Sequence, residues 1–420
     1  MNVRTRIGSA VRWAVTELSD ATARTDLDTW EDPVGRTRVW SRPDFRRAAE
    51  ELPPHRALQL VAFDHRGPRM FVPLLLTERA GGLLFYDVPA MAGDERAFGD
   101  SARLVEDERP NVTDTEMVSA REVAYPSLAV GSYGAYHGIL AHPTGDPEER
   151  ASLLESLPTA VAEAADELRC ASHALLYLTP ELLRAMGSSA SEYRTAVLGA
   201  ESVLECSGES WEDYLASLST RRRSRVARER RAYEQSEIVS EIRTGPDALG
   251  EDLIEMRANL RVRHGMPPDR ERSAAEFASL ARWCGDRVIV NRAWRDGAVV
   301  GFVVLLLDGD TVYARTAGFD YERLTTHHYC YFNLVYYDVL EWGLPRGVRR
   351  LELGLAAYPA KRTRGCGFEP RFGLFSFGPD NPLERALVAQ DTGERRRLVQ
   401  ECGSGMARAD LDVTEGTAWM

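Results

Sequence analysis

Lysine is almost missing from this sequence. Of its 52 lysine and arginine residues, only Lys361 is a lysine. A GC-rich genome favours arginine codons wherever any cation will serve, and that bias accounts for most of the arginines. A lysine that persists against it indicates a position that needs a compact, strongly hydrated charge, which a planar guanidinium does not provide. Lys361 is therefore the first candidate for a functional residue.

Cysteine is sparse, and its spacing excludes two classes of protein. The six cysteines lie far apart, with no Cys-x-x-Cys pair and no histidine at a metal-ligand spacing from them. Isolated thiols of this kind are typical of a reducing compartment rather than of a disulfide scaffold or a zinc site. We therefore expect a cytoplasmic protein with no metal.

Long apolar runs and the motifs of several enzyme classes are also missing. The apolar run at residues 298–307 is far shorter than the roughly 20 residues that span a bilayer. No Ser-His-Asp order, His-Glu-x-x-His, P-loop or Rossmann fingerprint occurs, so hydrolase, metalloenzyme, kinase and dehydrogenase functions have no support. The net charge of −12 excludes a protein that coats nucleic acid with its whole surface, although it allows a local basic patch.

The length and pattern of the chain predict two α/β domains. A chain of 420 residues is too long for one ordinary core. Strand-like and helix-like segments alternate throughout, which is typical of a mixed α/β protein. We expect one lobe at residues 1–206, a second at 207–380, and a C-terminal helix and tail at 381–420.

The second lobe has the clearer pattern of elements. A strand near residues 237–242 is followed by two helices, three strands, a helix near 329–342 and two further strands. The turns Asp296-Gly297 and Asp308-Gly309 join the three central strands, and Asp-Gly is a strong hairpin signal. We expect mixed, mostly antiparallel sheets flanked by helices.

An arginine-rich helix opens this lobe. Ser210 is placed to cap a helix that begins at Trp211 and runs on to about Gln235. Between Arg221 and Arg231 there are seven arginines, opposed by a single glutamate. Their mutual repulsion indicates an anionic partner, either RNA phosphate or an acidic neighbouring surface. The alternative is that carboxylates of this acidic chain pair with them.

Two stretches of the second half resemble the FemABX-type peptidyltransferases and the related peptidoglycan-biosynthesis-like proteins, which have two tandem lobes of the GNAT acetyltransferase fold. One is residues 214–218 with the arginine cluster that follows. The other is residues 351–354, followed by Tyr358, Lys361, Arg364-Gly365 and residues 367–370. Members of the family typically carry a lysine a few residues ahead of an Arg/Lys-Gly-Phe element, just after the penultimate strand. The similarity covers residues 211–377, and the N-terminal lobe matches only in the order of its elements.

The resemblance implies acyl transfer to an amine, with two kinds of donor in the family. Some members take amino acids from aminoacyl-tRNA and attach them to amines of peptidoglycan precursors or small natural products, whereas others are assigned to acyl-CoA by fold. CoA-dependent lobes usually carry a glycine-rich loop whose N–H groups bind the pyrophosphate. Here no glycine occurs from Phe319 through Trp342, and Asp320 and Glu322 lie where phosphate would bind.

This departure favours aminoacyl-tRNA as the co-substrate, with no further cofactor, over a CoA thioester. A small-molecule amine is the expected acceptor. The third interpretation is a non-catalytic protein that uses the same fold and the arginine helix to bind RNA or a partner.

The family motif implies some of the site residues, and the local sequence elsewhere, at the start of the 329–342 helix and among the glycines of the N-terminal lobe, indicates the others. Lys361 is the expected catalytic cation, because an ammonium aimed at the developing oxyanion stabilises the tetrahedral intermediate. His264 follows a helix where GNAT lobes place acceptor-binding residues, and is the expected proton acceptor. Each has a structural alternative as a loop or helix-end residue. The residues expected to bind substrate are Arg362, Arg364, Tyr358, Phe368, His328, Tyr329, Tyr136 and His137. The expected RNA contacts are Arg221, Arg222, Arg223, Arg225 and Arg228.

Overall fold

The chain forms two compact units. The computed structural model describes residues 5–7, 11–17, 27–51, 55–81, 83–93, 114–263, 268–378, 380–406 and 408–412. Unit 1 contains residues 1–46, 53–201 and 368–420, and unit 2 contains residues 47–52 and 202–367. The C-terminal region, expected as a separate helix and tail, therefore belongs to unit 1, because β14 (Gly367–Ser376) pairs with β7 (Ser172–Leu178) of that unit. Within the described ranges, no helix is long and apolar enough to cross a bilayer.

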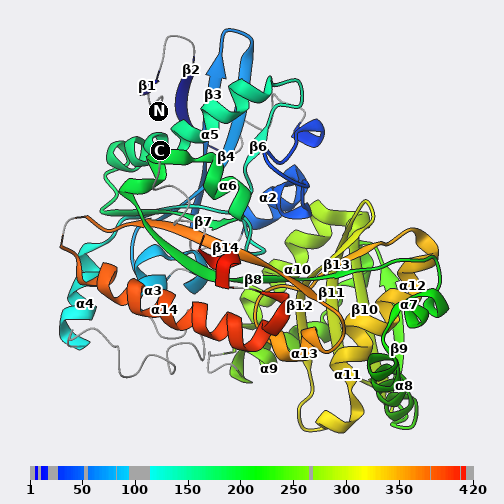
Figure 1. Cartoon of the computed structure of the whole chain (residues 1–420). Coiled ribbons are helices and arrows are strands. Elements are labelled where there is room, and N and C mark those ends of the chain that lie inside the picture. The colour runs from blue at the N-terminus through cyan, green and yellow to red at the C-terminus, as the bar shows by residue number, and fades with distance from the viewer. Residues whose placement is uncertain are drawn as a thin grey trace. The chain divides into compact units, whose positions relative to one another are not determined.

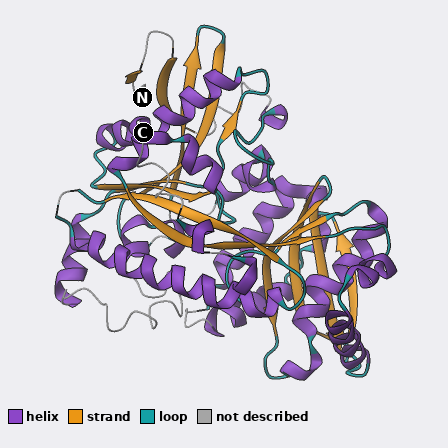
Figure 2. Cartoon of the chain, viewed as in Figure 1, coloured by secondary structure: helices purple, strands orange, loops and turns teal. Residues whose placement is uncertain are grey.

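Unit 1 is built on a mixed sheet with the strand order β1-β2-β3-β4-β5-β7-β14-β8, and β6 pairs with β4 (Figures 1 and 2). β5 and β7 run parallel, whereas β2, β3, β4 and β5 follow one another antiparallel. The remaining strands of this sheet are β1 (Thr5–Ile7), β2 (Val11–Glu17), β3 (Arg56–Asp64), β4 (Gly67–Thr77), β5 (Ser127–Val130), β6 (Leu140–Ala141) and β8 (Arg194–Glu205). Its helices are α2 (Pro43–Glu50), whose end lies in unit 2, α3 (Val88–Gly93), α4 (Asp114–Val123), α5 (Pro147–Glu167), α6 (Pro180–Ala185), α14 (Pro382–Cys402) and α15 (Arg408–Leu411).

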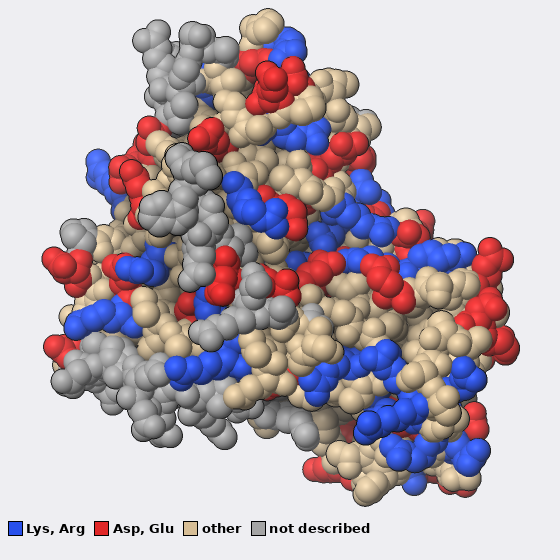
Figure 3. Space-filling model, viewed as in Figure 1, with Lys and Arg blue, Asp and Glu red and all other residues tan. Residues whose placement is uncertain are grey.

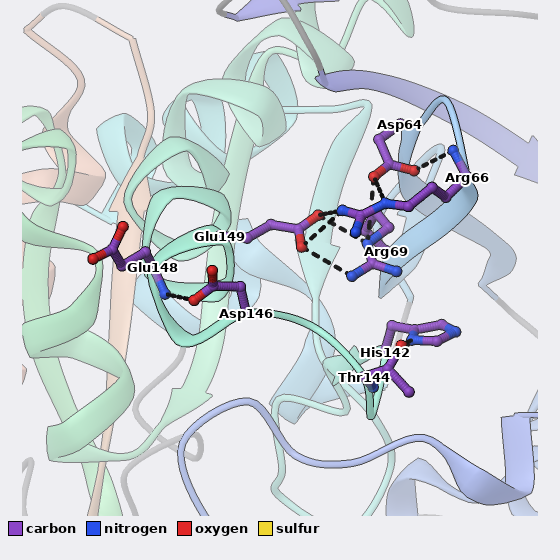
Figure 4. Close-up of polar contacts among 8 residues, drawn as sticks. All are labelled: Asp64, Arg66, Arg69, His142, Thr144, Asp146, Glu148 and Glu149. Carbon is purple, nitrogen blue, oxygen red and sulfur yellow. Dashed lines mark hydrogen bonds and ion pairs between the residues drawn. The ribbon is translucent and has the colours of Figure 1, made fainter.

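A charged network holds the start of α5 against the β3–β4 hairpin (Figure 4). Arg69 donates from Nε and Nη2 to the two carboxylate oxygens of Glu149, at 2.8 and 2.9 Å. Arg66 donates from Nη2 to the same Glu149 carboxylate at 3.2 Å, and from Nε to the Asp64 carboxylate at 2.8 Å. The hydrogen bonds from Arg69 lower the pKa of Glu149. This network therefore has a structural role, since it links α5 to β4 within unit 1.

Unit 2 is built on the strand order β8-β13-β12-β11-β10-β9 (Figure 1). All neighbours are antiparallel except β12 and β13. The fold class, mixed and mostly antiparallel sheets flanked by helices, is confirmed. The elements expected for this lobe occur in the expected order, but the last strand, β14, lies in unit 1 from Phe368 onward. The further strands of unit 2 are β9 (Val239–Thr244), β10 (Val288–Arg295), β11 (Ala298–Asp308), β12 (Thr311–Phe319) and β13 (Arg350–Glu352). Its helices are α7 (Trp211–Ser217), α8 (Thr220–Glu234), α9 (Asp252–Arg263), α10 (Arg270–Cys284), α11 (Cys330–Phe332), α12 (Asp338–Gly343) and α13 (Tyr358–Arg362).

The prediction of two hairpins is confirmed, although the second turn is Gly309-Asp310 rather than Asp308-Gly309, because Asp308 pairs with Thr311. The prediction of a single arginine helix is wrong. Asp296 and Gly297 have φ of 52° and 75°, both left-handed, as a two-residue turn between twisted strands requires. The helix that begins at Trp211 ends at Ser217, because Leu218 adopts an extended conformation with ψ of 144°. Ser219 then caps a new helix, α8, by accepting from the N–H of residue 222.

β12 and β13 separate soon after they pair. Their parallel ladder covers only Thr311–Tyr313 of β12, opposite the whole of β13. β12 continues to Phe319, while the chain after β13 leaves in a turn. This splay lies where the ends of two parallel strands diverge, a position at which α/β sheets commonly bind ligands.

Candidate functional site

The turn after β13 has an unusual backbone. Ala356 and Ala357 have φ of 68° and 53°, so two consecutive residues with a Cβ are left-handed. Each such residue costs roughly 1–2 kcal/mol relative to a right-handed conformation. Strain of this kind persists only where surrounding contacts impose it, and it is concentrated at functional sites. At Ala357 the backbone carbonyl accepts from the Lys361 N–H at 3.3 Å, at the start of α13 (Tyr358–Arg362).

Lys361 is buried beneath this turn, with only 2% of its surface exposed. Its Nζ donates to the backbone carbonyls of Leu353 at 2.8 Å, Gly354 at 2.7 Å and Leu355 at 3.3 Å. An ammonium has three N–H donors in a tetrahedral arrangement, which suits three convergent carbonyls. The planar guanidinium does not fit them. The geometry thus gives a physical reason for a lysine at this position.

Arg364 joins the same segment to the arginine helix. Its Nη2 lies 2.7 Å from the Oε2 of Glu229, and both side chains are almost wholly buried. Nη1 donates to the Ala360 carbonyl at 2.8 Å, and Nε donates to the Tyr337 hydroxyl at 3.3 Å. Burial raises the pKa of Tyr337, whose hydroxyl also donates to Glu229. The substrate contact expected of Arg364 would require it to leave Glu229.

α8 separates its arginines into two faces. On the face toward the rest of unit 2, Arg223 donates to the Leu215 carbonyl at 2.9 Å, which satisfies the C-terminus of α7. On the same side, Arg230 binds Asp338 at 2.6 Å and lies over the ring of Trp211. Glu229 is buried beside these residues. The internal carboxylates therefore pair with one side of the helix only.

The opposite face of α8 carries a stripe of unpaired charge. Arg221, Arg225 and Arg228 follow one another at the four- and three-residue spacing that places side chains on one helical face. Within the described ranges they make no hydrogen bond or ion pair, and Arg221 and Arg228 are exposed. Figure 3 shows basic side chains gathered where Figure 1 places α8. Arg222, also exposed, donates to the Arg362 carbonyl at 3.5 Å.

The connection between β12 and α11 uses its own amides. Asp320 Oδ1 accepts from the N–H groups of Glu322 and Arg323, at 3.0 and 3.1 Å. His328 Nδ1 accepts from the Thr325 N–H at 3.3 Å, and burial lowers the pKa of this histidine. The N–H groups of Leu324 and His328 also donate within this connection, to the carbonyls of Asp320 and Thr325, and the Asp320 N–H donates to the Val300 carbonyl of β11.

The helix that follows is irregular. Tyr329, half-buried, has a left-handed φ of 51°, and residues Asn333–Tyr337 form a π-helical turn between α11 and α12. π-turns inside helices are frequent at functional sites. Here the turn places Asn333, which bonds Arg230, and Tyr337, which bonds Arg364, on the side of the helix that contacts α8 and α13.

The other expected substrate-binding residues are dispersed. Tyr358 is fully buried at the start of α13, Arg362 is half-buried at its end, and Phe368 is half-buried in β14. Tyr136 and His137 are buried in unit 1. His264 lies outside the described residues.

His137 belongs to a buried polar pair of unit 1. Its Nε2 lies 3.2 Å from Asp32 Oδ2, and its Nδ1 accepts from the Ile139 N–H at 3.1 Å. The hydrogen bond at Nδ1 leaves the proton on Nε2, toward the carboxylate. Burial lowers the pKa of His137, although the Asp32 charge opposes that effect. A neutral histidine fixed in this way is a structural element of the core.

Two residues of the site were missed by sequence reasoning. Glu229 was counted only as the lone acid among arginines, and Tyr337 was not among the expected site residues. Together they receive Arg364. The isolation of one carboxylate within seven arginines was the signal for Glu229, since a buried acid needs a cation partner. Among the described residues, no group of three or more His, Cys, Asp or Glu side chains could hold a metal ion.

Comparison with known proteins places these features in a family context. A family model described as FemAB-like, peptidoglycan biosynthesis/recognition, matches residues 138–401. No curated protein matches the sequence. Among solved structures, FemX is 11% identical with a TM-score of 0.49, over 84% of this chain and 94% of that chain. The L-PGS of Bacillus licheniformis is 11% identical with a TM-score of 0.46, over 82% and 91%. A tandem GNAT protein from the clavulanic acid biosynthesis pathway is 12% identical with a TM-score of 0.44, over 88% and 99%.

Proposed function

The chain belongs to the FemAB-like family of peptidoglycan biosynthesis/recognition proteins and is a GNAT-fold transferase, and on that premise we propose that it moves an aminoacyl group from aminoacyl-tRNA to an amine of a small-molecule or cell-wall-precursor acceptor. The family predicted from the two motif stretches is confirmed by the match over residues 138–401. The observation that carries the choice of donor is the unpaired face of α8. That helix is joined through Glu229 to the segment that contains Lys361.

The arginine stripe supports an RNA donor for a physical reason. Arg221, Arg225 and Arg228 place three positive charges on one face, and the carboxylates of the described residues neutralise only the other face. Nucleic-acid phosphate is the ligand that releases counterions on meeting such a face. Arg222 and Arg223, also expected as RNA contacts, donate to backbone carbonyls instead. The proposed RNA site is therefore limited to the three arginines of the stripe.

The connection after β12 weighs against a CoA donor. A pyrophosphate cradle needs backbone N–H groups that are free to turn toward the ligand. Here Asp320 accepts two of them and adds a negative charge beside Glu322. A CoA thioester would have to displace these bonds and overcome the charge of both acids.

The chemistry proposed for the splay is amide formation by direct attack. The acceptor amine attacks the ester carbonyl carbon of the aminoacyl group, and the carbonyl oxygen becomes an oxyanion. When the intermediate collapses, the 3′ oxygen of the tRNA leaves with a proton and the amine loses one. Lys361 is the proposed cation for the oxyanion, and its contact to Leu355, the longest of the three at 3.3 Å, is the donor most easily exchanged.

The decisive experiment is transfer of a radiolabelled amino acid from total charged tRNA to candidate amines, with product identified by mass spectrometry. RNase treatment before the enzyme is added should abolish product. Product that survives RNase, together with thermal stabilisation of the protein by CoA, would instead establish the acyl-CoA function. Retained tRNA binding without product in any acceptor mixture would favour the non-catalytic function.

The role of the stripe is tested by salt dependence of tRNA binding. Each phosphate contact contributes roughly 0.7–0.9 to the magnitude of the slope of log affinity against log salt. The triple variant Arg221→Gln, Arg225→Gln and Arg228→Gln removes three such contacts and should therefore reduce that magnitude by about 2. The matched control replaces three other arginines by glutamine, and so changes the net charge by the same amount. These are Arg184, Arg194 and Arg243, which are exposed and paired with acids. Equal slopes for the two triple variants would remove α8 from the RNA site.

A further inference from the structure

β9 is an open edge of the unit 2 sheet. Among the described strands it pairs with β10 only, and the strand order ends there (Figure 1). The ladder runs over all six residues of β9, Val239–Thr244, without a shift in register. None of the six is a proline or a lysine. Prolines, lysines and bulges are devices that keep an edge strand from pairing, and β9 lacks all three.

The free edge presents the backbone groups of alternate residues. The Gly245 N–H donates to the Val288 carbonyl at 2.9 Å. Because alternate residues of an antiparallel strand direct their backbone groups to the same neighbour, every second residue back from Gly245 bonds β10. The residues between them, Ser240, Ile242 and Thr244, therefore direct their N–H and C=O away from the sheet. In the described part of the chain, no helix or loop supplies a backbone partner to these three.

The charges on β9 suit pairing with a copy of the same strand. Glu241 and Arg243 are two residues apart, so their side chains lie on one face of the sheet. Arg243 Nη2 lies 2.9 Å from Glu241 Oε2, and about half of each side chain is exposed. When two such strands pair antiparallel about Ile242, each Glu241 stands opposite Arg243 of the second copy. Opposite charges in directly opposite positions stabilise a strand pair.

The same charges disfavour the neighbouring registers. Moving the centre of pairing by one residue, to Glu241 or to Arg243, keeps outward backbone groups facing each other. It also places like charges directly opposite, which destabilises the pair. About Ile242, by contrast, the three outward residues meet one another: Ile242 faces its own copy, and Ser240 faces Thr244. Each of these pairs exchanges both of its backbone hydrogen bonds.

We propose that β9 pairs antiparallel with β9 of a second copy of the chain, about a two-fold axis at Ile242, so that the unit 2 sheets of a homodimer are continuous. The contact is isologous, because both copies use the same surface. Val239, 66% exposed, lies opposite Gly245 of the second copy, where a Cβ would meet no atom within 4 Å. One short strand gives a small interface, so the dimer is weak and depends on concentration. The inference does not depend on the proposed reaction.

Sedimentation equilibrium of the full chain tests the charge pairing. The mass of the wild type should rise toward twice that of the monomer as protein concentration increases. Glu241→Arg surrounds the axis with cations only and should weaken association about tenfold or more. Combining Glu241→Arg with Arg243→Glu exchanges the two charges and should restore association. The control Glu181→Arg makes the same charge change at an exposed acid of α6 and should leave association unchanged. Thermal unfolding checks that each variant is folded.

A cysteine at the axis tests the register. Opposite residues of a hydrogen-bonded pair have Cα atoms about 5.5 Å apart, within the range that a disulfide spans. With oxidised glutathione, which is reduced as the two thiols are oxidised, Ile242→Cys should form a covalent dimer. Thr244→Cys faces Ser240 of the second copy and should form none. Five of the six native cysteines are buried, and the wild type under the same oxidant gives the background.

Three results would overturn the proposal. The first is a wild type that stays monomeric up to its solubility limit. The second is association that Glu241→Arg leaves unchanged, and the third is equal cross-linking of Ile242→Cys and Thr244→Cys. Because Arg243 belongs to this interface, the salt dependence of tRNA binding is compared at protein concentrations at which the wild type and both triple variants sediment as monomers.

Discussion

Removing the Lys361 ammonium tests both the fold of the turn and the proposed chemistry. In Lys361→Met the side chain keeps a similar length and stays apolar, but the three N–H donors are lost. The carbonyls of Leu353, Gly354 and Leu355 then lose their common partner. We expect lower stability and loss of transfer activity. Lys361→Arg should also fail, because a planar fork cannot direct three donors at these convergent oxygens.

The size of the stability loss follows from what each carbonyl retains. Gly354 O still accepts from the Ser202 N–H at 3.2 Å. Leu355 is half-buried, so water can replace its donor. The loss falls mainly on Leu353, which is 6% exposed. A buried acceptor left without its charged donor costs about 2–3 kcal/mol, and we expect Lys361→Met to lower the free energy of unfolding by about that amount.

A compensating change separates the structural role of Lys361 from a catalytic one. Glycine at positions 356 and 357 removes the Cβ strain of two left-handed residues, so Ala356→Gly with Ala357→Gly should restore about 1 kcal/mol to the Lys361→Met variant. Urea unfolding and the tRNA-dependent transfer assay are run on the wild type, on Lys361→Met and on the triple variant that combines Lys361→Met with both glycine substitutions. If the triple variant recovers stability and also activity, Lys361 is a positioning residue and the oxyanion role is refuted. If Lys361→Met unfolds at the wild-type urea midpoint, the energetic reasoning is wrong.

Two further predictions concern packing and pH. Gly318→Ala should cost about 1–3 kcal/mol of unfolding free energy, because its Cβ would overlap the Met256 carbonyl group, whereas Gly131→Ala, with its nearest atom at 3.6 Å, should cost much less; thermal unfolding compares them. Glu149 has a lowered pKa, so its stabilising contribution is present above its ordinary value near 4.5 and is lost as pH falls through the lower folded value. Arg69→Gln should therefore flatten the stability–pH curve below about pH 4.5, and an unchanged curve would contradict the network in Figure 4.

The site was predictable from sequence only where a motif or composition marked it. Lys361 stood out because it is the only lysine in the chain, and the motif placed it after the penultimate strand. Its burial and its three carbonyl partners were not predictable, since they depend on how the turn folds back over α13. Arg364 was expected to bind substrate, but no local pattern indicates that the carboxylate of Glu229 lies beside it.

By itself the sequence determined the local order of the protein. The period of apolar residues set the strands and helices of unit 2, and Asp-Gly turns set its hairpins, because these signals act between residues close along the chain. Only the tertiary structure decided the long-range pairs. Glu229 and Arg364 are 135 positions apart, and their contact joins α8 to the segment that contains Lys361. Such partners are selected by packing and by the cost of burying an unpaired charge, quantities that exist only once distant segments meet.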